Sequence, residues 1–221
     1  MNPNALYDGL IGYLIFLIVL TFHEAGHAWM SWKRGDDTAR LLGRITLNPL
    51  AHMDLLGTVI LPLLGVFLGA AGSGAARFII GWGKPVPVNP ANLKNPQFDG
   101  MLIALAGPLM NVLVAMVAMM IVRGGHLGAL NWLMELGVQT AIISMFLCFF
   151  NLLPIPPLDG SHVLRYVANW SDETYHAFAQ YGFLAVIIVI QLDVVNQFLA
   201  FLTVRSVSVM AMLVGLGNRF I

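Results

Sequence analysis

The segment His23-Glu24-Ala25-Gly26-His27 places two imidazoles and a carboxylate within an apolar stretch of the chain. A helix turns about 100° per residue, so side chains four residues apart lie on one face, about one turn from each other. His23 and His27 could therefore bind one divalent cation such as Zn²⁺, and Glu24 could take a proton from a water bound to it. Ionisable side chains in a hydrophobic segment are costly, which favours a chemical role over two histidines hydrogen-bonded in a core.

The composition indicates that this chemistry is set in a membrane. Hydrophobic residues make up 58% of the chain and charged residues 10%, whereas soluble proteins average about 45–50% and about 25%. We therefore predict an integral membrane protein with the lipid bilayer as its surroundings. The formal net charge of +0 gives no indication of a nucleic-acid partner. With Cys148 as the single cysteine, an intramolecular disulfide is excluded.

The apolar stretches predict an all-α polytopic membrane protein with about five to six transmembrane segments, since about 20 apolar residues cross the bilayer as a helix. We expect a single membrane-embedded domain over residues 1–221, with a motif-bearing core at about 7–168 and C-terminal apolar helices at about 175–217. The predicted spans are 7–32, 98–122 and 132–153, followed by a last apolar pair at 175–192 and 194–216 that could form two crossings or include a surface helix.

A catalytic zinc normally has three protein ligands and an open position, so a third ligand must come from elsewhere in the chain. Asp159 is the preferred candidate, because it follows a helix end broken by Pro154, where a side chain can be presented at membrane depth. Taken alone, Asp159-Gly160 could equally be an ordinary turn. The other candidates are the remaining histidines and several aspartates: His52, Asp54, Asp99, His126, His162, His176 and Asp193.

Taken together, the motifs resemble those of the site-2 protease family of intramembrane zinc metalloproteases. The resemblance is carried by His23-Glu24-x-x-His27 in one span and Asn151-x-x-Pro154-x-x-x-Leu158-Asp159-Gly160 at the end of another. Gly107-Pro108-x-x-Asn111 and the proline-rich stretch at 81–90 are similar to a compact prokaryotic-type branch. The resemblance covers about residues 14–163, and the chain has no room for an inserted PDZ-type domain.

The resemblance implies one Zn²⁺ per chain, held by His23, His27 and Asp159, with Glu24 as general base on zinc-bound water. It implies a zinc-dependent intramembrane endopeptidase that hydrolyses a peptide bond in or near a transmembrane segment of a membrane-protein substrate. The expected partners are a transmembrane protein or peptide substrate and the bilayer of a prokaryotic cell membrane. The oligomeric state does not follow from it.

The three ligands must lie at one depth, which constrains the path of the chain. If residues 55–82 crossed the membrane once, Asp159 would emerge on the side opposite His27. We therefore predict a re-entrant, partly extended element at 55–82, between the HExxH helix and the next core helix. Most lysines and arginines then lie on the cytoplasmic side, and the active site faces that side. Arg77 and Arg205 do not fit this pattern.

Two asparagines in the spans are candidates for substrate binding. Asn151 could donate to the substrate backbone or to an oxyanion, and Asn111 could orient a neighbouring helix or ligand. Equally, both could satisfy carbonyl groups freed by nearby prolines. A helix keeps its scissile carbonyls in internal hydrogen bonds, so the substrate must be locally unwound. Residues 76–80 or 85–88 could pair with the unwound strand, or they could be a simple loop. His162 could support a metal ligand or be a solvated interfacial residue.

Two other functions stay open. A membrane metal transporter also places histidine and glutamate on membrane helices, but it would need a relay of polar ligands, whereas the ionisable residues here cluster at one level. A non-cleaving zinc-binding scaffold would not need Glu24. Zinc-dependent cleavage of a transmembrane peptide that is lost in Glu24→Gln would separate all three.

Overall fold

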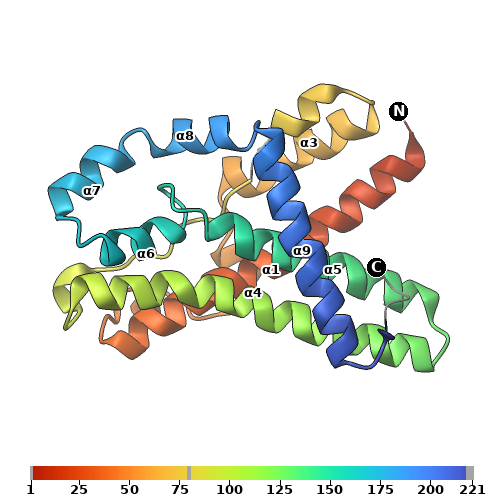
Figure 1. The fold of residues 1–221 in the computed structure, drawn as a ribbon, viewed down its shortest axis with the longest axis horizontal. Helices are drawn as coiled ribbons and strands as arrows, with labels where there is room; N and C mark the ends of the chain where they lie inside the picture. The colour runs from red at the N-terminus through yellow and green to blue at the C-terminus, as the bar shows by residue number, and fades with distance from the viewer. Residues whose placement is uncertain (1, 79–80, 218–221) are drawn as a thin grey trace.

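The computed structural model describes residues 2–78 and 81–217 (Figure 1). Four helices in these residues are long and apolar enough to cross a membrane: α1 (Pro3–Arg34), α4 (Pro96–Leu127), α5 (Asn131–Asn151) and α9 (Asp193–Leu213). The shorter elements are α2 (Thr38–Leu41), η1 (Pro49–Ala51), η2 (Leu55–Ile60), α3 (Leu61–Ala70), η3 (Gly74–Phe78), η4 (Pro90–Asn92), α6 (Gly160–Val167), α7 (Asp172–Ala179) and α8 (Gly182–Val189).

This architecture confirms the predicted all-α polytopic class, and the described residues contain no β-strand. The stretch at 175–192, for which the sequence left open a full crossing or a surface helix, is divided between α7 and α8, which have eight residues each. A helix rises about 1.5 Å per residue, so neither could cross a bilayer alone. The turn between them lies at Gln180 and Tyr181, and α8 begins at Gly182, where an added Cβ would lie 2.2 Å from the carbonyl oxygen of Pro156, so only glycine fits there.

The element at 55–82 turns back on itself, as the depth argument predicts. Its far end lies beside the start of α1, because the amide of Asn2 donates to the carbonyl of Ala70 at 2.9 Å. Its second limb returns to the beginning, where the amide of Trp82 donates to the carbonyl of Gly57 at 2.9 Å. Ile79 and Ile80, part of one candidate substrate-pairing segment, lie outside the described residues.

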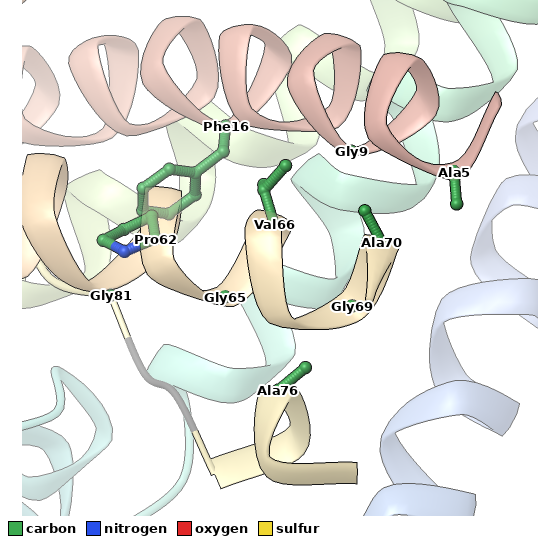
Figure 2. Close-up of a pocket in the computed structure, with 10 residues that line it drawn as sticks. All are labelled: Ala5, Gly9, Phe16, Pro62, Gly65, Val66, Gly69, Ala70, Ala76 and Gly81. Atoms are coloured by element: carbon green, nitrogen blue, oxygen red, sulfur yellow. The ribbon is translucent and has the colours of Figure 1, made fainter. Parts of the chain in front are cut away.

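The first limb of this re-entrant element packs along the first half of α1. Figure 2 shows α3 beside α1, with Val66 directed toward Gly9. A Cβ added at Gly9 would lie 2.8 Å from a Val66 methyl carbon, so the glycine permits this close approach. Small residues are the usual means by which helices approach closely in a membrane.

The other long helices form the core around α4. A buried cluster joins Ala115, Ala118, Met119 and Val122 of α4 to Ala141, Met145 and Cys148 of α5 and to Val207, Met210 and Ala211 of α9. Helices α4 and α5 are antiparallel neighbours joined by the short connection at 128–130. The Ser144 hydroxyl of α5 donates to the carbonyl of Asn111 at 2.8 Å, so α5 ends beside the first half of α4, short of the residues where α4 begins.

The loop after α1 is fixed to the chain that precedes α4 by a buried carboxylate. Asp36 accepts hydrogen bonds from the Ser31 hydroxyl at 3.1 Å, from the Asn89 amide at 2.8 Å and from the Asn92 side chain at 2.8 Å. Thr38 donates through its amide and its hydroxyl. Burial raises the pKa of Asp36, but these hydrogen bonds outweigh it and lower the pKa to about 2.

Candidate metal centre

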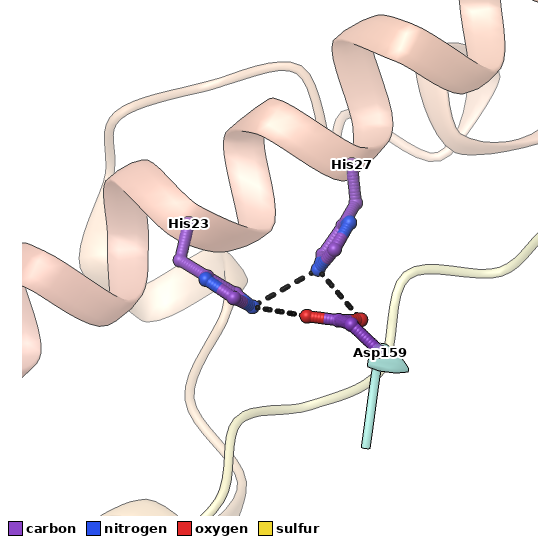
Figure 3. Close-up of side chains that lie close together, drawn as sticks. All are labelled: His23, His27 and Asp159. Atoms are coloured by element: carbon purple, nitrogen blue, oxygen red, sulfur yellow. Dashed lines mark hydrogen bonds and ion pairs between the residues drawn. The ribbon is translucent and has the colours of Figure 1, made fainter. Parts of the chain in front are cut away.

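Three side chains from two distant parts of the chain converge on one point (Figure 3). The Nε2 atoms of His23 and His27 are 3.0 Å apart. One Asp159 oxygen lies 3.2 Å from Nε2 of His23, and the other lies 3.4 Å from Nε2 of His27. This is the one group of metal-ligating side chains within the described residues, with candidate ligand atoms all within 4.8 Å of one another. The structure thus brings together the three residues that the sequence analysis selected.

The ring of His27 is oriented by a backbone carbonyl of α4. Its Nδ1 lies 2.7 Å from the carbonyl oxygen of Ile103, which can only accept a hydrogen bond. Nδ1 therefore carries the ring proton in the neutral imidazole, and Nε2 presents its lone pair to the cluster. That is the tautomer a metal ligand requires.

The ring of His23 is contacted from behind by Asn111, whose Nδ2 lies 3.1 Å from Nδ1. Asn111 is fully buried, its Oδ1 has no hydrogen-bond partner, and its backbone carbonyl accepts from the Ser144 hydroxyl of α5 at 2.8 Å. Asn111 is absent from the residues that line the cavity described below. Asn111 therefore contacts the His23 ring from a position outside the cavity lining.

Two glycines allow α1 and α4 to hold both imidazoles between them. A Cβ added at Gly107 would lie 2.4 Å from Nε2 of His27 and 2.7 Å from Cε1 of His23. A Cβ added at Gly26 would lie 2.5 Å from Cγ of Met110 and 2.9 Å from the carbonyl oxygen of Ala106. Both glycines lie within the motifs noted in the sequence, but their role as space for the rings depends on the helix packing.

Asp159 is presented by an irregular turn between α5 and α6. The turn contains three prolines, at positions 154, 156 and 157, which prevent α5 from continuing. A Cβ added at Gly160 would lie 2.2 Å from the carbonyl oxygen of Leu152, so the backbone folds back tightly on the end of α5. The Ser161 hydroxyl donates to the carbonyl of Leu158 at 2.7 Å and closes the turn.

The three side chains and Glu24 line one cavity of about 680 Å³. The lining also includes residues of 81–88, here called the wall segment, and side chains of α8. Asn151 lines the cavity while its Nδ2 donates to the carbonyl of Leu147 at 2.9 Å. His162 also lines the cavity, and its Nε2 lies 3.4 Å from the Tyr175 hydroxyl.

The sequence model of peptidase family M50 matches residues 11–129 and 125–192. The chain belongs to this family. The protein named "Putative zinc metalloprotease YwhC" from Bacillus subtilis is 33% identical over 165 residues, which are 71% of this chain and 69% of that protein.

Two further relatives extend the comparison. "Putative zinc metalloprotease Rip2" from Mycolicibacterium smegmatis is 31% identical over 193 residues, covering 82% of this chain and 67% of that protein. "Putative zinc metalloprotease MJ0611" from Methanocaldococcus jannaschii is 48% identical over 74 residues, covering 32% and 36%. No solved structure gives a significant match.

The family membership confirms the resemblance noted in the sequence, and with the metal-binding group it makes this integral membrane protein a metallopeptidase. The other third-ligand candidates lie outside the group in the described residues. Asp54 caps η2, Asp99 forms an ion pair with Arg34 at 2.6 Å, and His52 is buried with its ring against the carbonyl of Thr46. These roles are structural.

Proposed function

We propose that this protein is a zinc-dependent intramembrane endopeptidase that hydrolyses a peptide bond in or near a transmembrane segment of a membrane-protein substrate. The observation that carries the proposal is the convergence of His23, His27 and Asp159 beside Glu24 in a cavity among membrane-spanning helices. The relatives named as zinc metalloproteases support it.

The donor set suits zinc. Two imidazole nitrogens and one carboxylate oxygen are ligands that a catalytic zinc takes, leaving a position open. His23, His27 and Asp159 would hold one Zn²⁺ per chain, with the rings in the space left by Gly107. When bound, the ion would supply a Lewis acid that activates water and polarises the scissile carbonyl.

Glu24 is the proposed general base. It lines the cavity next to the ligands and accepts no hydrogen bond from the residues that the structure describes. Its carboxylate is therefore available to take a proton from the attacking water and to return it to the amine nitrogen that leaves. A base of this kind contributes about 10²- to 10⁴-fold to the rate.

Asn111 is the proposed orienting partner of His23. A ring that binds metal through Nε2 carries its proton on Nδ1 and needs an acceptor there. Rotating the Asn111 amide by half a turn would place the unpartnered Oδ1 at that atom. In this arrangement Oδ1 of Asn111 accepts a hydrogen bond from Nδ1 of His23, as the Ile103 carbonyl accepts one from Nδ1 of His27.

The substrate is proposed to enter the cavity as a locally unwound chain. A regular helix has no free carbonyl to offer, and the cavity is lined mainly by apolar side chains. Asn151 uses one Nδ2 hydrogen on its own helix and keeps a second, which could reach a substrate carbonyl. We also infer that the site faces the cytoplasmic side of a prokaryotic cell membrane; a reporter fused near Lys94 that reads as external would contradict this.

The test is cleavage of a model transmembrane peptide by the purified protein in detergent. We expect cleavage that requires zinc, stops with a chelator and is lost in Glu24→Gln, whose bound zinc remains at the wild-type level. Glu135→Gln, an exposed residue of α5, is the matched control and should cleave normally. Zinc movement across vesicles without cleavage would favour a transporter, and zinc binding without either would favour a scaffold.

A further inference from the structure

Arg44 is a buried cation bound to the backbone of the wall segment. Arg44 is only 5% exposed. Its Nη2 donates to the carbonyl of Lys84 at 2.5 Å, and its Nη1 donates to the carbonyl of Pro85 at 3.0 Å. Its Nε has no partner, and no carboxylate in the described residues forms an ion pair with it. Burying a charge in this way costs free energy, which makes a purely structural link between two loops an expensive solution.

The wall segment that Arg44 holds is in contact with Glu24. A Cβ added at Gly83 would lie 3.1 Å from Oε1 of Glu24 and 3.1 Å from a methyl carbon of Leu20, so the bare backbone packs against the carboxylate. Since Glu24 has no hydrogen-bond partner among the described residues, packing against Gly83 limits where this carboxylate can lie. The position of Gly83 therefore matters to the proposed base.

The wall segment has further anchors on its other side. The amide of Trp82 donates to Gly57 at 2.9 Å, and the amide of Lys84 donates to the carbonyl of His52 at 2.8 Å. Arg44 holds the next two carbonyl groups along the chain, which follow Gly83 directly. Without Arg44 the Lys84 amide would still be held by His52, but the carbonyl groups of Lys84 and Pro85, the next two after Gly83, would lose their hydrogen bonds.

Arg44 and Glu24 also interact through their charges. Burial lowers the pKa of the Arg44 guanidinium, and the Glu24 carboxylate raises it in part, which places the two groups within electrostatic reach. The guanidinium stays charged in proteins.

We propose that Arg44 is a positioning residue of the peptidase: its fork on the Lys84 and Pro85 carbonyls keeps Gly83 against Glu24 and so sets where the base meets the attacking water. The proposal rests on the proposed function. Displacement of a reacting group by about 1 Å can cost about 10²-fold in rate. Lysine keeps the charge but has a single nitrogen, so it cannot reproduce the two hydrogen bonds in the geometry of the planar fork.

The first test compares Arg44→Gln and Arg44→Lys with the wild type in the peptide assay. We expect Arg44→Gln to lower kcat about 10- to 100-fold, as loss of a supporting contact does at other metal sites, with KM within about twofold and bound zinc unchanged. Arg44→Lys should fall between the two. The control is Arg40→Gln, which removes a charge from an exposed arginine paired with Asp37 in the same loop and should leave kcat unchanged.

The second test is a double-mutant cycle with Gly83→Ala. The added methyl group meets Glu24 directly and should lower kcat by itself. If Arg44 acts through this contact, adding Arg44→Gln to the Gly83→Ala variant should lower kcat further by less than a few-fold. The effects of residues that act as a unit do not add. If Arg44→Gln does not fold with zinc bound, Arg44→Lys replaces it in the cycle.

The outcomes separate this inference from the function on which it rests. Unchanged kcat in Arg44→Gln, an increase in KM alone, or fully multiplicative losses in the cycle would overturn the positioning role. Activity that survives in Glu24→Gln or in chelator would overturn the proposed function instead. A drop in zinc content equal to the drop in kcat would show that Arg44 supports the metal centre and not the base, and would also reject the inference.

Discussion

Replacing Gly107 with alanine should separate zinc binding from folding. The new Cβ would lie 2.4 Å from Nε2 of His27 and 2.7 Å from Cε1 of His23. Since non-bonded atoms are relaxed at about 3.5 Å, at least one ring must move by about 1 Å. Overpacking of this size typically costs about 1–3 kcal/mol of stability, which a folded domain can tolerate. Zinc binding should tolerate this change much less than folding does, because both rings are displaced from the one point at which they would hold the ion.

We expect Gly107→Ala to bind zinc about 10- to 100-fold more weakly and to cleave a transmembrane peptide about 10²-fold more slowly. Zinc affinity is measured by competition with a chromophoric chelator, and folding by the thermal transition of the metal-free protein in detergent. The matched control is Gly124→Ala on the same helix, where an added Cβ has no atom within 4 Å. It should leave zinc affinity unchanged.

The result that would refute this reasoning is a Gly107→Ala protein that binds zinc with wild-type affinity. The two imidazoles would then not need the space between α1 and α4, and the close approach of the helices would have no bearing on the metal. A loss of zinc that is matched in Gly124→Ala would point to general damage of α4 and would contradict the steric argument equally.

The other expected outcomes concern the base, the orienting amide and a buried carboxylate. Glu24→Gln should lose cleavage by about 10²-fold or more in single-turnover assays at saturating zinc, and residual activity within about tenfold of wild type would reject its role. Asn111→Ala should weaken zinc binding about 10- to 100-fold, whereas Asn111→Asp, which keeps an acceptor for His23, should retain more of the affinity. The pKa of Asp36 is about 2, below an unfolded value of about 3.9, so its stabilisation is present above pH 4 and is lost as pH falls toward 2. In metal-free protein, Asp36→Asn should therefore reduce the loss of thermal stability between pH 6 and pH 3, whereas Asp37→Asn, which removes only a solvent-exposed pair with Arg40, should reduce it less; equal losses in wild type and Asp36→Asn would contradict this.

Local spacing and composition were enough to predict the class of the protein and the two imidazole positions. A four-residue spacing on a helix puts His23 and His27 on one face whatever surrounds them. The apolar stretches predicted about five to six transmembrane segments, and four of these are the long helices of the described residues, because length and hydropathy are properties of a single segment. Even the returning path at 55–82 could be predicted, since all ligands must share one depth.

The break between α7 and α8 could not be predicted in this way. Residues 175–192 are apolar enough for one span, and hydropathy carries no information on the contact of Gly182 with Pro156. The packing of a glycine against a distant carbonyl is a tertiary contact. This contact outweighs the preference for one long helix that the hydropathy of the segment indicates.

The sequence by itself therefore determined that this is a polytopic membrane protein with an HExxH helix and a short set of third-ligand candidates. Only the tertiary structure decided that Asp159 meets the two rings, that Asn111 stands behind His23, and that Arg44 reaches the wall segment some 40 residues away. The physical reason is that helix periodicity and hydropathy act over a few residues, whereas these contacts depend on how α1, α4 and their loops pack together.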